Sequence, residues 1–69
     1  MPTKENKKRC YRLLAEKRFA KKPDDISVHQ WAAVKSIMER RFYDELNKTP
    51  FGLYTSEQIW NQTFKNYLL

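Results

Sequence analysis

Side chains that catalyse reactions in enzymes are scarce in this chain of 69 residues. Its only histidine is His29 and its only cysteine is Cys10, whereas nucleophilic catalysis needs a nucleophile held by an oriented base. The acidic pairs at 24–25 and 44–45 are adjacent along the chain, so they do not predict a facing general acid and base. One glycine is too few for a phosphate-binding loop. We therefore predict a protein that is not an enzyme, binds no small-molecule substrate and needs no cofactor.

The same residue types predict no metal site and no disulfide framework. One cysteine and one histidine are too few ligands for structural zinc. We expect Cys10 to be a small, helix-facing residue and not a reactive thiol. We expect His29 to lie on a solvated helix face. A domain this small must then be stabilised by helix packing, by its ten aromatic residues, or by a partner that covers apolar surface.

Cationic side chains, by contrast, are concentrated near the N-terminus. The formal net charge of the chain is +6. Residues 1–22 hold nine cations against two acids, a net +7, and the remainder holds five against six, a net −1. Such segregation is typical of a solvated face or of a surface that binds an anion such as phosphate. We favour the anionic partner, with contacts from Lys7, Lys8, Arg9, Arg12, Arg18 and Lys22.

Two smaller groups of residues are further candidates. Arg40 and Arg41 form a second basic cluster, whose alternative explanation is pairing within the helix, such as Arg40 with Asp44. Ile37 falls outside the apolar face predicted for its helix, which suggests a second covered side. Phe51 and Tyr54 lie in a predicted turn, where they either contact a protein partner or close over the end of the core. We predict protein contacts from Ile37, Phe51 and Tyr54.

The elements that position these residues are predicted to be all helical. One glycine, three prolines and no alternation of β-branched residues favour a small all-α, three-helix domain. The first, basic helix spans about 4–21 after Thr3 as N-cap, and Pro23 ends it. The capping boxes that begin at Ser27 and Thr55 start a long central amphipathic helix, ending near Asn47, and an aromatic-rich third helix. Residues 1–69 form one domain, in which 1–9 are either helical or a flexible basic arm.

The two later helices show clear apolar faces. In the central helix the face contains Val28, Trp31, Ala32, Val34, Met38, Phe42 and Leu46. In the third helix it contains Ile59, Trp60, Thr63, Phe64, Tyr67 and Leu68. The first assignment makes Trp31 a core residue, whose replacement by alanine would cost about 3–5 kcal/mol.

The chain lacks the sequence signals of membrane insertion. No apolar run approaches 18 residues, and no apolar signal region follows the first positive charges. The basic first helix also lacks the Trp and Leu content that membrane-surface binding requires. We expect a cytoplasmic protein with no membrane partner.

The order of residues over about 9–60 resembles that of the Hha/YmoA family of nucleoid-associated modulators. The similar positions are Cys10, Ile26, Ser27, Gln30, Ala32, Ser36, Glu39, Arg41, Leu46, Tyr54, Ile59 and Trp60. The resemblance implies an all-helical helper that docks on an H-NS-type silencing protein and adds positive charge towards DNA, with Arg40 and Arg41 as its basic pair. The chain departs from the family in its more basic N-terminus and in the segment 37–41.

These observations favour a regulatory module, bacterial or phage, that binds DNA or a DNA-bound protein complex in transcription or nucleoid regulation. Base-specific readout is not predicted, because the connection over about 47–55 is too long for a helix-turn-helix turn. The alternatives are a protein-only inhibitor or adaptor that docks on an acidic patch of a host protein such as RNA polymerase, and an RNA- or ribosome-binding protein. The oligomeric state stays open.

Overall fold

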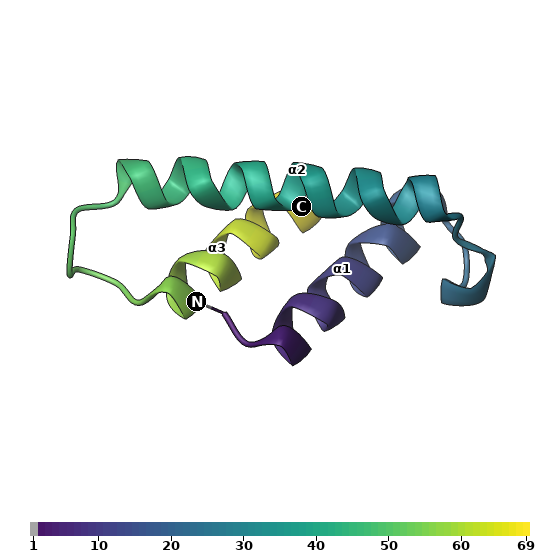
Figure 1. Ribbon diagram of the computed structural model, residues 1–69, viewed down its shortest axis with the longest axis horizontal. Helices are drawn as coiled ribbons and strands as arrows, with labels where there is room; N and C mark the ends of the chain where they lie inside the picture. Colours follow the sequence, from purple (N-terminus) through teal and green to yellow (C-terminus); the bar gives the residue numbers. More distant parts are fainter. Residues whose placement is uncertain (1) are drawn as a thin grey trace.

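The first helix begins and ends at recognisable caps. In the computed structural model, which describes residues 2–69, α1 spans Lys4–Phe19 (Figure 1). The Thr3 side chain accepts a hydrogen bond from the backbone N–H of Asn6 at 3.2 Å, as expected of an N-cap. The C-cap residue after Phe19 is Ala20, whose φ of 52° is left-handed. Residues 4–9 therefore form the first turns of α1.

The two capping boxes predicted from the sequence are confirmed. A short 3-10 helix, η1 (Pro23–Asp25), leads to α2 (Val28–Lys48), and α3 spans Ser56–Leu68. At Ser27 the hydroxyl accepts from the N–H of Gln30 at 3.2 Å, and the Gln30 side chain accepts from the N–H of Ser27 at 3.0 Å. Thr55 and Gln58 make the same pair of bonds at 3.1 and 2.8 Å. The predicted all-α fold with three helices is confirmed.

α1 and α3 lie side by side across one side of α2 (Figure 1). Near their N-termini the Asn6 side chain donates to the Glu57 carboxylate at 2.8 Å and to the Asn61 side-chain oxygen at 3.0 Å. Near their C-termini Arg18 donates to the Tyr67 hydroxyl at 2.7 Å. Since like ends are joined to like ends, α1 and α3 run in the same direction.

The core lies where the three helices meet, and Trp60 is its centre. The buried apolar residues come from every helix: Cys10, Tyr11, Leu14 and Ala15 from α1, Val34, Met38 and Phe42 from α2, and Ile59, Trp60 and Phe64 from α3, with Ile26 from the loop. Trp60 is fully buried and packs edge-to-face on Tyr11 and Phe42, with ring centroids at 5.7 and 5.1 Å. Its indole N–H donates to the Cys10 sulfur at 3.3 Å.

The predicted apolar face of the central helix is wrong at its N-terminal end. Val28 is 81% exposed, Ala32 is exposed, and Trp31 is only half-buried at the edge of the core. At about 100° per residue, Ala32 lies about 120° around the helix from Met38, outside a stripe of ordinary width. Val28 shares the angle of Leu46, which packs against the core, but it lies at the first position of α2. Because Trp31 is only half-buried, we expect Trp31→Ala to lose less stability than the apolar pattern of the sequence predicts.

Candidate functional site

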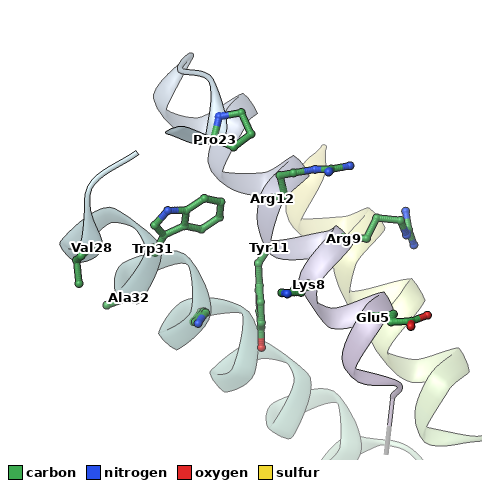
Figure 2. A pocket seen from close by; sticks show the side chains of 10 residues that line it. Glu5, Lys8, Arg9, Tyr11, Arg12, Pro23, Val28, Trp31 and Ala32 are labelled. Carbon is green, nitrogen blue, oxygen red and sulfur yellow. The ribbon is translucent and has the colours of Figure 1, made fainter. Parts of the chain in front are cut away.

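A groove of about 790 Å³ runs between α1 and the N-terminal part of α2 (Figure 2). Pro23 of η1 lies at one end, and Trp31 of α2 points into the space between the two helices beside Tyr11 of α1. Ten residues line the groove: Glu5, Lys8, Arg9, Tyr11, Arg12, Pro23, Val28, Trp31, Ala32 and Lys35. Trp31, Val28 and Ala32 of α2 thus form the apolar wall of the groove, and of the three Trp31 points towards α1.

Cations outnumber acids around this groove. Its lining contains four cations and one carboxylate, that of Glu5. Lys8 lies beside Tyr11 (Figure 2), and the ammonium of Lys35 lies 5.9 Å from the centroid of the Tyr11 ring. Arg12 is one helical turn beyond Lys8 and is also exposed. The groove therefore combines an apolar wall with a positive rim drawn from two helices.

Tyr11 connects the groove to the core. Its ring is buried, and its hydroxyl donates to the Glu39 carboxylate of α2 at 3.2 Å. Burial, and after it the negative charge of Glu39, raises the pKa of the Tyr11 phenol well above its ordinary value. The phenol accordingly stays protonated as a hydrogen-bond donor and holds α1 against α2.

We expect this phenol to make the fold sensitive to alkali. Because the pKa of Tyr11 is raised in the folded chain, the unfolded chain ionises first, and stability falls as pH rises above about 10, by up to about 1.4 kcal/mol per pH unit. Tyr11→Phe should lose stability less steeply over that range in urea unfolding. Tyr54→Phe, at an exposed position of the connection between α2 and α3, is the control and should follow the wild type. Equal slopes in all three proteins would contradict the assignment.

The predicted cations of α1 divide between the two neighbouring helices. Lys8, Arg9 and Arg12 are among the residues that line the groove. Lys7 is half-buried, with its ammonium 5.5 Å from the centroid of Trp60. The Arg9 guanidinium lies 5.7 Å from the centroid of Phe64 and donates to the Asn6 side chain at 2.8 Å. Figure 2 shows Arg9 and Arg12 pointing away from α2. The structure therefore does not gather these cations on one face of α1.

A pairing that the sequence did not reveal forms around Tyr67 of α3. Arg18 of α1 donates to the Tyr67 hydroxyl, and the Arg41 guanidinium of α2 lies 4.7 Å from the centroid of the same ring. Arg40 and Lys22 are exposed. Thus Arg18 and Arg41, predicted as separate groups, meet at one aromatic side chain.

The predicted protein-contact residues do not form one surface. Ile37 is half-buried on α2, whereas Phe51 and Tyr54 lie in the connection between α2 and α3. Phe51 is fully exposed, and Tyr54 is 56% exposed. Their neighbour Leu53 is exposed as well, at 60%. The alternative in which Phe51 closes over the core is therefore wrong.

Sequence reasoning missed the groove itself, because it placed Trp31, Val28 and Ala32 in the core. The apolar face assigned to the central helix spans about 160° at 100° per residue, wider than the stripe of about 100° that one packed side requires. That excess width was the available signal of a second apolar surface. The charge pattern of the sequence does not identify Lys35, because no other cation lies next to it in the chain.

Comparison with protein-family models, with curated proteins and with solved structures gives no match to this chain. Among residues 2–69 no three His, Cys, Asp or Glu side chains gather as a metal site would require. Over the same residues, no helix has both the length and the apolar character needed to cross a membrane.

Proposed function

We propose that the protein is a small, non-enzymatic regulatory module that binds DNA or a DNA-bound protein complex through the cations of its N-terminal helix. One observation carries the proposal: of the nine cations in residues 4–22, all but Lys7 are exposed. Only Glu5 and Glu16 oppose them within that segment. The charge that segregates in the sequence is therefore available at the surface to a polyanion.

The expected mechanism is sequence-independent contact with phosphates. Lysine and arginine side chains that neutralise phosphates release condensed counterions, which favours binding at low salt. α2 ends at Lys48 and α3 begins at Ser56, so the connection is longer than the turn of a helix-turn-helix motif. This supports attachment to the DNA backbone without base readout.

The proposal is tested by titrating a labelled, random-sequence DNA duplex with the protein and following fluorescence anisotropy. For about six phosphate contacts the slope of log affinity against log salt is about −5, a loss of about 10³ between about 50 and 200 mM salt. The same titration with duplex and single-stranded RNA addresses the RNA-binding alternative, in which RNA binds more tightly than DNA. Absence of DNA binding at the lower salt would contradict the proposal.

A second candidate function is favoured by the apolar wall of the groove. Trp31, Val28 and Ala32 add nothing to phosphate binding, but apolar side chains beside cations suit an acidic protein surface. In this alternative the protein is an inhibitor or adaptor that docks on a host protein such as RNA polymerase. Pull-down from nuclease-treated extract distinguishes the two, since a protein-only contact survives the removal of DNA.

The resemblance to the Hha/YmoA modulators stays a prediction. It would assign Arg40 and Arg41 to the approach towards DNA. Both are exposed, and the Arg41 guanidinium lies over the Tyr67 ring. In this proposal the affinity for DNA comes chiefly from α1.

A further inference from the structure

We propose that the groove between α1 and α2 binds an acidic, amphipathic helical segment of a partner protein. Apolar side chains of that segment lie against Trp31, Val28 and Ala32, and its carboxylates face Lys8 and Lys35. The groove shares the lining residues Lys8 and Arg12 with the basic surface of α1, whereas its apolar residues Trp31, Val28 and Ala32 belong to α2. Peptide binding through these apolar residues is therefore tested separately from DNA binding.

The apolar part of the occupant follows from the wall of the groove. A volume of about 790 Å³ lies within the range of about 300–1,000 Å³ that is usual for binding sites. Val28 is a large aliphatic side chain that α2 leaves exposed, and it shares the groove with Ala32 and a half-buried Trp31. Val28 and Ala32 are one turn apart on one helix, so together they offer an apolar strip suited to the i, i+3 and i+4 side chains of a docked helix.

The acidic part of the occupant follows from charge complementarity. Four cations and one carboxylate line the groove, and Lys8 and Lys35 approach Tyr11 from different helices. The two carboxylates of η1, Asp24 and Asp25, are not among the lining residues. Carboxylates spaced one turn apart along a docked helix would meet the positive rim, whereas a basic segment would be repelled.

A nucleic acid fits this groove less well than an acidic helix. Binding of single strands relies on aromatic ring faces on which bases stack. The Tyr11 ring is buried, packs on Trp60 at one side and has Lys35 near its face. Only Trp31 remains for stacking, while Val28, Ala32 and Pro23 offer neither stacking surfaces nor hydrogen bonds. The apolar wall therefore favours a protein segment.

The test uses a synthetic 16-residue helical peptide with leucine at i, i+3, i+4 and i+7 and glutamate on the flanking positions. Binding to the ¹⁵N-labelled protein is followed by NMR chemical shifts, including the indole signals of both tryptophans. We expect the largest shifts at Lys8, Trp31, Ala32 and Lys35, and small ones at the buried indole of Trp60. A scrambled peptide of the same composition and a version with lysine for glutamate are expected to bind at least about tenfold more weakly.

Matched substitutions on α2 test the location. Ala32→Glu places a negative charge in the groove and is expected to weaken peptide binding about tenfold or more. Ala33→Glu makes the same change at the next exposed position, which does not line the groove, and should bind within about twofold of wild type. Val28→Glu is a second groove variant, at the first position of α2, where a negative charge is tolerated. Circular dichroism verifies that all three remain folded.

Three results would overturn the inference. Equal affinities of the Ala32→Glu and Ala33→Glu variants would place the peptide elsewhere. Shifts confined to residues 49–69 would place it on the α2–α3 connection or α3. Larger groove shifts with a single-stranded oligonucleotide of equal charge would assign the groove to nucleic acid. DNA binding is measured in a separate titration, so absence of DNA binding with intact peptide binding would contradict the proposed function and leave the groove assignment standing.

Discussion

Replacing Trp60 by alanine is expected to remove a large share, up to all, of the stability of the domain. The indole is fully buried, packs on Tyr11 and Phe42, and donates its N–H to Cys10, so it contacts both other helices. Truncating a buried tryptophan costs about 3–5 kcal/mol. A domain of this length has a total stability of only about 3–10 kcal/mol. Helical circular dichroism with urea unfolding measures the effect.

Trp31→Ala provides the comparison for Trp60→Ala. Because Trp31 is only half-buried at the edge of the groove, the variant should stay folded and unfold cooperatively, with a loss of about 1–2 kcal/mol. Trp60→Phe, which keeps an aromatic ring but loses the N–H donor, should fall between the two. A folded Trp60→Ala protein beside an unfolded Trp31→Ala protein would show that Trp31, not Trp60, is the central core residue.

Removing two cations from α1 is expected to weaken DNA binding more than removing two cations elsewhere. Lys8 and Arg12 are exposed and adjacent on one side of α1. Replacing both by alanine should reduce the affinity for duplex DNA by about tenfold or more at 50 mM salt and make the salt slope smaller by about 2. The loss should be the same for every DNA sequence, because phosphates carry no sequence information.

The control for this variant is Lys48→Ala with Lys65→Ala. Both lysines are exposed and lie outside the N-terminal segment, so the control removes the same net charge from α2 and α3. Its affinity for DNA should stay within about threefold of wild type. Equal losses in the two double variants would mean that net charge alone, and no surface of α1, attracts the DNA.

The helices and their caps were predictable because they depend on neighbours in the sequence. Ser27 with Gln30 and Thr55 with Gln58 bond within one turn, which the residue types alone indicate. α1 was harder to place, because it packs against two helices at once and buries Cys10 as well as Tyr11. Its buried face is consequently wide, and the apolar periodicity is poor.

Burial and the site depended on contacts between distant residues. Both tryptophans lie on apolar helix faces, and only the crossing of α1 and α3 beneath α2 determines that Trp60 is buried and Trp31 borders a groove. The cations at positions 8 and 12 were identified from the sequence. Lys35 and the apolar wall could not be, because the groove brings together parts of the chain more than fifteen residues apart. The meeting of Arg18 and Arg41 at Tyr67 likewise depends on contacts between three different helices, which the sequence pattern does not reveal.

The central claim is that the N-terminal helix is the surface that contacts a polyanion, and NMR mapping tests it most directly. The ¹⁵N-labelled protein is titrated with an unlabelled random-sequence duplex at about 50 mM salt, where phosphate contacts are strongest. The account predicts that the perturbed amides and arginine side chains belong mainly to residues 4–22. Perturbations confined to residues 40–69, or none at saturating DNA, would contradict it.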